Sequence, residues 1–338
     1  MASCTKVIAG TSAIALLYQR GFIDIHDKVS KYIPGFECQG KQSITVLNLL
    51  LHNAGLPPDP SPNFDTVKFG CPETMKPHPE MTFTCRKKCY EALVDQKLDG
   101  PVGQNYVYSD ISFMAIMNIV GRVAKESGLV SQSDIMKGCP LGERGEEQCY
   151  YEAFVRKFVI NALKLQNTLY NPPKPMWKSI PPTENETHYR TRIIQGQVHD
   201  PNTYAMGGIS GHAGLFSNAD DLVSIGRAWL FAPPASDVFL NKATATLFAT
   251  QWNHSQSSRA LGWNTNSPDA PDHGWEFSCG TLSNVTFMHT GYTGTMICLD
   301  PDRGVGVILL TNRVYPDTST GTKIRDFRRM CTTKVQQI

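Results

Sequence analysis

The strongest constraint on the fold is a change of pattern toward the end of the chain. Residues 286–291, 294–300 and 304–311 alternate between apolar and polar positions or run apolar, which is typical of β-strands. The sequence Pro-Asp-Arg-Gly at 301–304 predicts a turn between the last two runs, and therefore an antiparallel strand pair. A C-terminal helix is predicted after them, near residues 322–331.

The middle of the chain instead carries apolar residues at helical spacing. Helices are predicted over residues 43–52, 110–127, 148–166 and 219–231. Ser109 or Asp110 is placed to cap the second of these helices, and Asn218 the last. Helices in the middle and strands at the end indicate an α+β fold, an antiparallel sheet flanked by helices, rather than a doubly wound parallel sheet.

Composition excludes several classes of protein. Of the 338 residues, 41% are hydrophobic and 18% charged, which is incompatible with a disordered chain. Lys and Arg number 32 against 30 Asp and Glu, so the net charge of +2 leaves no basic surplus for nucleic acid or an anionic membrane. The chain has no apolar run of about 18 residues, so no membrane-spanning helix is predicted.

The first twenty residues have two interpretations on their own. One lysine precedes an apolar stretch from Val7 to Leu17, as in the hydrophobic region of a signal peptide. The same stretch fits a buried helix that begins near Ser3 and ends at Gly21, a residue type suited to the position after a helix. The first 25 residues do not decide between these alternatives.

Ten cysteines and three glycosylation sequons bear on the compartment. Cys85-x₃-Cys89 with His78 is a metal candidate whose spacing does not match a zinc site, whereas a local Cys139–Cys149 disulfide is the favoured interpretation. Disulfides require an oxidising compartment, so a secreted or lumenal location is predicted. Three glycosylation sequons, at Asn185, Asn253 and Asn284, also favour a secreted or lumenal location. Random sequence yields such triplets readily, so they are a weak indication.

Three short motifs carry possible chemistry. Ser3 and Lys6 form S-x-x-K, and residues three apart share one face of a helix, so the hydroxyl can meet the amine. A serine hydroxyl needs an adjacent base, and a lysine in a dry, cation-crowded pocket can lose its proton and serve. Tyr108 begins a Y-S-D motif at a predicted helix start, and His289 begins H-T-G in a predicted strand.

Each motif also has a structural interpretation. Ser3 could simply cap a helix, Lys6 could be solvated, and Tyr108 and His289 could be structural side chains. Cys4 is expected to be a buried apolar residue rather than a nucleophile. The agreement of order, spacing and predicted secondary structure favours a catalytic set. His199 and His212, in or next to a glycine-rich segment, are expected to have structural roles near the cleft; no Walker-type loop and no H-E-x-x-H motif occurs.

With these motifs, the chain resembles the serine β-lactamase and penicillin-binding-protein superfamily. It is most similar to the class C β-lactamase-related branch, which has Y-x-N-type second motifs and often H-T-G as the third. The stretches LLLHNAGLP at 49–57, VHDPNTYAMGGISGHAGLFSNADDL at 198–222 and residues 289–316 match as well, as do residues 3–21 and 23–36. The resemblance covers nearly the whole chain and favours the buried-helix interpretation of residues 1–20.

The resemblance implies a role for each motif residue. Ser3 would be the acylated nucleophile, Lys6 its activator, and Tyr108 the residue that passes a proton to the leaving group and helps activate water. His289 would take the place of the third-motif lysine. The backbone N–H groups of Ser3 and Tyr292 would form the oxyanion hole, where the loss of one donor typically costs about 3 kcal/mol.

Asp110, Thr290 and Gly291 would contact substrate, and Asp110 stands where many members of the family have Asn. A carboxylate cannot donate to a substrate amide, but it can pair with Lys6 and keep that lysine charged. His289 is largely neutral at pH 7, so it weakens any fixed positive charge for a substrate carboxylate. Both departures favour a neutral ester or peptide substrate, with less dependence on a carboxylate.

The resemblance therefore predicts a serine hydrolase that acts through an acyl-enzyme on a D-alanyl peptide, β-lactam or small ester, without cofactor or metal. A small-molecule or peptide substrate is expected as its partner, and the oligomeric state stays open. The alternatives are a catalytically impaired binding or scaffold protein, and a secreted interaction domain related by descent only. Labelling with a fluorescent penicillin and a fluorophosphonate would discriminate among these.

One catalytic domain over residues 1–338 is predicted. Its sheet region would comprise residues 1–25 and 260–338, and its helical and loop region residues 26–259. Family members place strands before the S-x-x-K helix, whereas only Met1 and Ala2 precede Ser3 here. Either the sequence is incomplete or the sheet is reduced, with an exposed edge.

Overall fold

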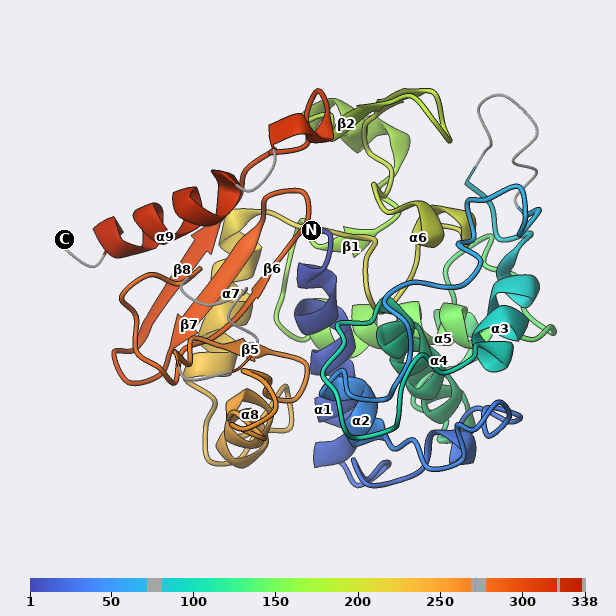
Figure 1. Cartoon of the computed structure of the whole chain (residues 1–338), viewed down its shortest axis with the longest axis horizontal. Helices are drawn as coiled ribbons and strands as arrows, with labels where there is room; N and C mark the ends of the chain where they lie inside the picture. The colour runs from blue at the N-terminus through green and yellow to red at the C-terminus, as the bar shows by residue number, and fades with distance from the viewer. Residues whose placement is uncertain (72–80, 269–270, 272–277, 321–322, 336–338) are drawn as a thin grey trace.

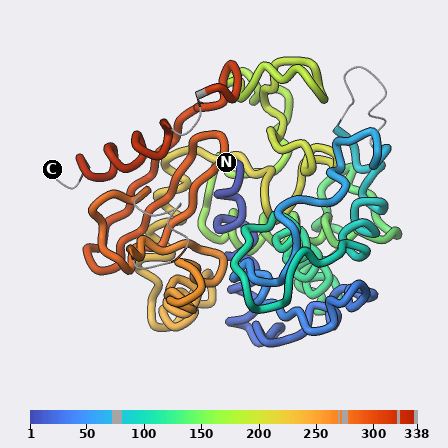
Figure 2. The backbone as a smooth tube through the Cα atoms, viewed as in Figure 1, coloured from blue at the N-terminus to red at the C-terminus, as the bar shows by residue number. Residues whose placement is uncertain are grey.

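The fold is described from a computed structural model that covers residues 1–71, 81–268, 271, 278–320 and 323–335. In Figure 1, a sheet with its covering helices lies on one side and a larger helical region on the other. The N-terminal helix runs between the two regions, as the tube in Figure 2 also shows. This arrangement confirms the predicted α+β, β-lactamase/transpeptidase-like fold; the division into domains stays a prediction.

The elements follow one another in this order: η1 (Lys6–Thr11), α1 (Ser12–Gln19), η2 (Val29–Lys31), α2 (Val46–Leu50), α3 (Arg86–Asp95), α4 (Asp110–Glu126), η3 (Gln132–Asp134), α5 (Glu147–Val155), η4 (Arg156–Ile160), β1 (Leu169–Tyr170), η5 (Lys174–Ser179), β2 (Glu184–Glu186), β3 (Arg192–Ile194), α6 (Pro201–Ala205), β4 (Leu215–Phe216), α7 (Ala219–Leu230), α8 (Lys242–Ala249), β5 (Asn264–Thr265), β6 (Phe287–Thr290), β7 (Met296–Asp300), β8 (Val305–Leu309), η6 (Thr318–Thr320) and α9 (Lys323–Val335).

The main sheet is antiparallel, in the order β5-β6-β7-β8. The three strands predicted from the C-terminal pattern are confirmed, and His289 pairs with Ile297 in the register of β6 and β7. β5 was not predicted because two residues are too few for a periodic pattern. Two further two-stranded pairs, β1-β4 and β2-β3, lie within the region that was predicted to be helical and irregular.

Helices cover the sheet. α7 packs against β7 and β8 and lies behind the strands in Figure 1, and α9 packs against β8. Asn218 caps α7, as predicted, by accepting the Asp221 N–H at 3.0 Å. Trp229 of α7 contacts Phe287 of β6, with ring centroids 6.2 Å apart, and this aromatic contact joins the helix to the sheet.

The N-terminal segment is a helix in the core of the protein, which confirms the buried-helix prediction for residues 1–20. Every residue from Cys4 to Leu17 is buried, and the helix ends before Gly21, which has φ +74°. η1 is a π-helical turn, a form often found at functional sites. It brings Lys6, fully buried, to the boundary between the sheet and the helical region.

α4 is the central helix of the other region. Ser109 caps it by accepting the Ser112 N–H at 3.3 Å, which settles the cap that the sequence left between Ser109 and Asp110. α5 packs closely on α4 at Gly121, where an added Cβ would lie 1.9 Å from the Glu147 carbonyl oxygen. The helix predicted over 148–166 ends earlier, at Ile160 of η4.

The structure confirms the Cys139–Cys149 disulfide and adds Cys71–Cys85 and Cys279–Cys298. The Cys85 sulfur is in a disulfide and so is not a metal ligand, which agrees with the poor match of the Cys85-x₃-Cys89 spacing to a zinc site. His78, the third residue of that candidate, lies outside the described residues. Three disulfides suit an oxidising compartment outside the cytoplasm.

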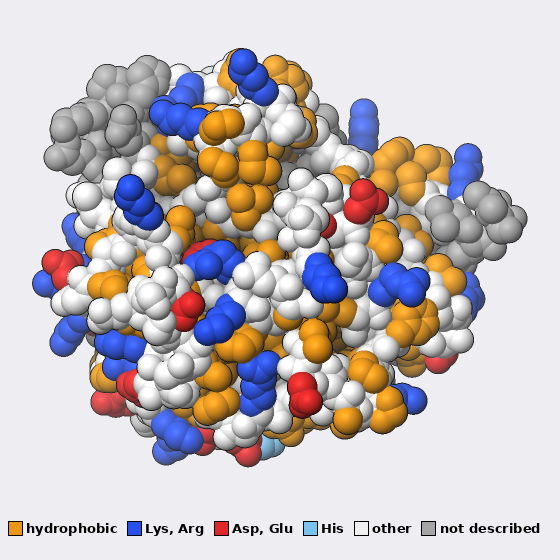
Figure 3. Space-filling view, turned by 180° about the vertical axis from the view of Figure 1, so that it is seen from behind, with side chains coloured by type: hydrophobic (Ala, Val, Ile, Leu, Met, Phe, Trp, Pro, Cys, Tyr) orange, Lys and Arg blue, Asp and Glu red, His pale blue; other side chains and the backbone are white. Residues whose placement is uncertain are grey.

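Two surface properties follow the composition. None of the helices in the described residues is long and apolar enough to cross a membrane. Lys and Arg side chains are scattered over the face shown in Figure 3 rather than gathered into one patch, in keeping with the small net charge.

Candidate active site

Ser3, Lys6 and Asp110 meet where the N-terminal helix approaches α4. The Lys6 Nζ lies 3.2 Å from the Ser3 Oγ and 2.6 Å from the Asp110 Oδ1. It also lies 3.5 Å from the His212 carbonyl oxygen. The pairing of Asp110 with Lys6, which the sequence suggested, is therefore present, and a single ammonium contacts the serine, the carboxylate and a carbonyl.

The pKa of Lys6 is raised above its usual value. Burial would lower it, but the charge and hydrogen bond of Asp110, together with Tyr108, outweigh the burial. Lys6 is thus a cation in the resting site. Of the two states that the sequence left open, a deprotonated lysine and one kept charged by Asp110, the second is present, because a carboxylate lies against Lys6.

Tyr108 is surrounded by basic side chains. The Lys6 Nζ lies 4.7 Å from the Tyr108 ring centroid, and the Arg259 guanidinium carbon lies 5.2 Å from it. Burial raises the pKa of Tyr108, although both cations oppose that shift. Tyr108 is therefore a neutral phenol at pH 7, able to donate a proton.

His289 lies near Tyr108, with ring centroids 6.2 Å apart. It is 3% exposed, and burial together with the charges of Arg259 and Lys6 lowers its pKa well below the usual value. Its Nδ1 lies 2.8 Å from the Thr290 carbonyl oxygen and so carries the proton, which leaves the lone pair on Nε2. His289 supplies no fixed positive charge, as its residue type predicted.

His52 lies on the other side of Tyr108, with ring centroids 4.7 Å apart, and sequence reasoning assigned it no role. Its Nδ1 accepts the Ser109 N–H at 3.0 Å, so the proton of the neutral ring is on Nε2. Because Ser109 lies between Tyr108 and Asp110, this bond holds the second motif in place. Only its place in LLLHNAGLP pointed to it.

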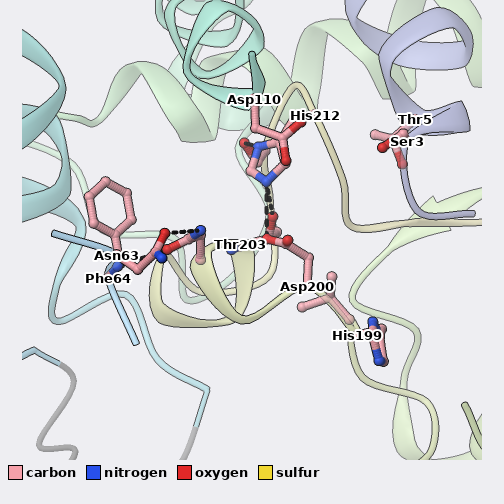
Figure 4. Close-up of polar contacts among 12 residues, drawn as sticks. Ser3, Thr5, Asn63, Phe64, Asp110, His199, Asp200, Thr203 and His212 are labelled. Carbon is pink, nitrogen blue, oxygen red and sulfur yellow. Dashed lines mark hydrogen bonds and ion pairs between the residues drawn. The ribbon is translucent and has the colours of Figure 1, made fainter. Parts of the chain in front are cut away.

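The buried His212 and the half-buried Asp200 form a second pair beside Asp110, in the centre of Figure 4. The His212 Nε2 lies 3.0 Å from the Asp200 Oδ1 and 3.0 Å from the Thr203 Oγ1, and its Nδ1 lies 2.8 Å from the Ser210 Oγ. Burial opposes ionisation of Asp200, but His212 and Thr203 outweigh it and lower its pKa. His212 is closer to the reacting groups than the sequence suggested.

Asp110, Asp200 and His212 could in principle hold a metal ion, since their ligand atoms lie within 4.8 Å of one another. The Lys6 ammonium already occupies the Asp110 carboxylate, and both ring nitrogens of His212 have partners. A second positive charge at this place would be repelled by the first. The donor set does not fit a resident metal ion.

Ser3, Tyr108, Asp110, Asp200 and His212 line a cleft of about 690 Å³. Its wall includes Thr290, Gly291 and Tyr292 of the third motif, beside Ser3. In the described residues, neither the Ser3 N–H nor the Tyr292 N–H donates to a backbone or side-chain acceptor. The two amides assigned to the oxyanion hole are therefore available to a ligand.

His199 lies at the rim of the cleft. Its Nε2 lies 2.6 Å from the Glu184 Oε2, and its ring stacks on Tyr292 with centroids 5.8 Å apart. Arg313 covers Tyr292 as well, with its guanidinium carbon 4.6 Å from the ring centroid. His199 thus supports the rim, in keeping with the structural role expected for it.

Known proteins share this fold and, in part, this sequence. The family model described as Beta-lactamase matches residues 1–326. The N-acetylmuramyl-L-alanine amidase of Bacillus subtilis (strain 168) is 32% identical over 335 residues, which cover 93% of this chain and 68% of that protein. A putative D-alanyl-D-alanine carboxypeptidase of Salmonella typhi is 29% identical over 342 residues, covering 93% of this chain and 69% of the relative.

Two solved structures have the same fold at lower identity. The β-lactamase/D-alanine carboxypeptidase from Yersinia pestis has a TM-score of 0.60 and 20% identity, covering 99% of this chain and 83% of the other. EstCE1, a hydrolase with promiscuous acyltransferase activity, has a TM-score of 0.63 and 18% identity, covering 97% and 84%.

The fold and the site define a serine hydrolase of the acyl-enzyme type, related to class C β-lactamases and penicillin-binding proteins. The chain belongs to the β-lactamase family. Nothing in the fold or in these comparisons supports the alternative of a non-catalytic binding or scaffold protein.

Proposed function

We propose that the chain hydrolyses an amide bond in an alanine-containing peptide or peptide conjugate, with Ser3 as the acylated nucleophile. The observation that carries the proposal is the 3.2 Å contact between the Lys6 Nζ and the Ser3 Oγ in the wall of the cleft. The backbone N–H groups of Ser3 and Tyr292 bind the oxyanion, and Thr290 and Gly291 line the substrate path.

The Lys6–Asp110 pair explains how a protonated lysine acts as a base. Over a 2.6 Å contact, the ammonium proton moves to the Asp110 carboxylate, and the neutral amine then takes the Ser3 hydroxyl proton as Oγ attacks the carbonyl carbon. When the C–N bond breaks, Tyr108 gives its proton to the leaving amine and regains one from Lys6. The Asp110 proton returns to Lys6. In deacylation, Lys6 again passes its proton to Asp110, and water takes the place of the serine hydroxyl and attacks the acyl carbonyl while the Lys6 amine takes the water proton. Tyr108 then protonates the Ser3 Oγ as the ester bond breaks, which releases the acid.

The substrate does not need a carboxylate next to the scissile bond. His289 stands where the family has a cationic residue, and burial keeps it neutral. The B. subtilis relative is named for an amide bond between a muramyl group and L-alanine. An acyl-alanyl amide of this kind is the substrate class that the site supports best.

A D-alanyl carboxypeptidase is the second candidate. Arg325 of α9 lines the cleft, is exposed, and has no hydrogen-bond or ion-pair partner among the described residues. It could bind a terminal carboxylate, and the S. typhi relative is named as a putative enzyme of this kind.

Covalent labelling tests the nucleophile. The protein is incubated with a fluorescent penicillin and, separately, with a fluorophosphonate, beside Ser3→Ala and a Ser61→Ala control. Wild type and Ser61→Ala are expected to be labelled, and Ser3→Ala to lose at least about a hundredfold in labelling rate. Equal labelling of folded Ser3→Ala would refute the assignment.

Product analysis tests the substrate class. N-acetylmuramyl-L-alanyl-D-isoglutamine and a peptide ending in D-Ala-D-Ala are offered separately, and released amines are followed by mass spectrometry. Cleavage of the muramyl amide with the higher kcat/KM is expected. A higher kcat/KM for release of terminal D-alanine, lost in Arg325→Gln, would instead establish the second candidate.

A further inference from the structure

A buried arginine on α9, at the wall of the cleft, bonds the backbone of the third motif. Arg328 is 5% exposed, whereas its neighbours Phe327 and Arg329 are exposed. One of its terminal nitrogens, Nη2, donates to the Gly291 carbonyl oxygen at 2.7 Å and to the Thr295 carbonyl oxygen at 2.9 Å. Among the described residues it has no carboxylate partner within ion-pair distance. Burial lowers its pKa to about 10, so it is a cation at neutral pH.

A buried cation whose hydrogen-bond partners, among the described residues, are carbonyl groups is a costly arrangement. A well-packed apolar side chain in its place would avoid the desolvation of the charge. What the guanidinium contacts is therefore informative, and it contacts the peptide unit that joins Gly291 to Tyr292. That unit carries the N–H assigned to the oxyanion hole.

The geometry of this peptide unit relates the arginine to the cleft. In a trans peptide the C=O and the N–H point in opposite directions, so fixing the Gly291 oxygen toward α9 directs the Tyr292 N–H away from α9. The Gly291 oxygen also accepts the Gly294 N–H at 3.0 Å, which holds the turn. In the part of the chain that the structure describes, the Tyr292 N–H has no acceptor of its own.

Gly291 lies directly against the segment that leads into Ser3. A Cβ added at Gly291 would come within 2.5 Å of the Met1 carbonyl oxygen, and the Thr295 Oγ1 donates to that same oxygen at 2.9 Å. The peptide unit held by Arg328 and the serine therefore share one wall of the cleft.

A second arginine holds the other side of Tyr292. The Arg313 Nε donates to the Tyr292 carbonyl oxygen at 2.7 Å. The carbonyl groups on the two sides of Tyr292 are thus both bonded to arginines: that of Gly291 to the buried Arg328, and that of Tyr292 itself to Arg313 at the rim. The orientation of the Tyr292 N–H does not depend on a substrate being present.

We propose that Arg328 is the positioning residue of the oxyanion hole: it orients the Tyr292 N–H and polarises that amide through the Gly291 carbonyl. This inference rests on the proposed function, because it needs an acyl-enzyme at Ser3. A cation on the carbonyl oxygen draws electron density from the amide and makes its N–H a stronger donor. The gain is largest when negative charge develops on the substrate oxygen, so it favours the transition state over the bound substrate.

A purely structural role predicts a different outcome. If Arg328 only tied α9 to the sheet, its loss would lower stability and disturb binding and catalysis without preference for the transition state. The test must therefore separate transition-state affinity from folding and from substrate binding.

The experiment compares Arg328→Met, Arg328→Lys and the matched control Arg329→Met with the wild-type chain. Arg329 is the exposed neighbour, and its Nη2 donates to the Asp326 Oδ1 at 2.8 Å. Three quantities are measured: the acylation rate and KM with p-nitrophenyl acetate, the inhibition constant of phenylboronic acid, and the infrared carbonyl frequency of the benzylpenicilloyl-enzyme.

The proposal makes a distinct prediction for each variant. Arg328→Met acylates about 10- to 100-fold more slowly with KM changed less than about threefold, and binds the boronic acid more weakly by a similar factor. Its acyl carbonyl band moves to higher frequency because the carbonyl is less polarised. Arg328→Lys, which can still donate to a carbonyl, gives an intermediate loss, and Arg329→Met behaves as wild type.

Either of two results would overturn the proposal. One is wild-type acylation by a folded Arg328→Met; the other is slower acylation with unchanged boronic acid affinity and an unmoved carbonyl band. If Arg328→Met does not fold, Arg328→Lys decides by the same measurements, and wild-type values in it refute the proposal. Absence of any acyl-enzyme in the wild-type chain would instead refute the proposed function.

Discussion

At the scale of single residues, Asp110 sets the protonation state of the site. Family members with Asn at this position would leave the lysine without a carboxylate partner. Here the Asp110 Oδ1 lies 2.6 Å from the Lys6 Nζ, and the pKa of Lys6 is raised although burial alone would lower it. Lys6 and Asp110 are therefore a coupled pair in their protonation.

Asp110→Asn is expected to move the pH dependence of acylation. Without the carboxylate, burial dominates and the pKa of Lys6 falls below its value in the wild-type site. The rise of the p-nitrophenyl acetate acylation rate with pH should then occur at a lower pH than in the wild-type protein. Stopped-flow rates between pH 5 and 10 measure this, with Asp65→Asn, which changes another cleft carboxylate, as control. An unmoved midpoint in folded Asp110→Asn would contradict the paired role.

At the scale of elements, the packing of α5 on α4 holds the helical side of the cleft. α4 begins with the second motif, so its position fixes Tyr108 and Asp110. The two helices approach closely at Gly121, where an added Cβ would lie 1.9 Å from the Glu147 carbonyl oxygen. The atom in the way is a backbone atom, which cannot move aside as the end of a flexible side chain can.

Gly121→Ala is expected to destabilise the protein by about 1–3 kcal/mol, although alanine favours a helix by about 1 kcal/mol over glycine. The matched control is Gly226→Ala in α7, where the added Cβ meets only the Leu299 Cδ2 at 2.9 Å. That side chain can turn aside, so this variant should stay within about 0.5 kcal/mol of wild type or gain stability. Urea denaturation of both variants measures the difference, and equal free energies of unfolding would show that the helices separate easily.

At the scale of the whole molecule, two neutral histidines link stability to pH. Burial lowers the pKa of His52 and of His289 well below 6.5, helped in both by Arg259 and Lys6. The unfolded chain protonates these histidines near pH 6.5, while the folded chain keeps them neutral. The contribution of these two histidines to the free energy of unfolding is therefore fully present above about pH 6.5 and is lost as the pH falls below it.

The free energy of unfolding is expected to fall below pH 6.5 by up to about 1.4 kcal/mol per pH unit for each histidine. Replacing His52 with Asn keeps an acceptor for the Ser109 N–H and removes one titrating group. Between pH 6.5 and 5, the free energy of unfolding of this variant should therefore change less steeply with pH than that of the wild-type protein, by the contribution of one histidine. Thermal or urea denaturation at several pH values measures both slopes. Equal slopes in the two proteins would mean that His52 titrates normally in the folded chain.

Much of the local structure was predictable because it depends on neighbours in the chain. The caps at Ser109 and Asn218, the strands β6, β7 and β8, and the Cys139–Cys149 disulfide between residues ten apart all follow from short-range patterns. The proximity of Ser3 and Lys6 has the same origin, since residues three apart lie on one face of a helix. The motifs could be recognised for this reason before the fold was known.

Other parts of the site depend on which surfaces pack together. Nothing near Arg328 in the sequence indicates that it reaches Gly291, 37 residues away, or that His52 holds the N–H of Ser109. The Cys71–Cys85 and Cys279–Cys298 disulfides were missed as well, because several pairings of ten cysteines satisfy the spacing.

The sequence by itself determined the fold class, the order of the three motifs and the residue types that do the chemistry, because helical and strand periodicity and short spacings are local properties. Only the tertiary structure decided that the Asp110 carboxylate lies against Lys6, that His289 is buried beside Tyr108, and that a buried arginine bonds the Gly291 carbonyl. Charge and protonation depend on burial and on the distance to groups far away in the chain, and those are set when the helices and the sheet pack together.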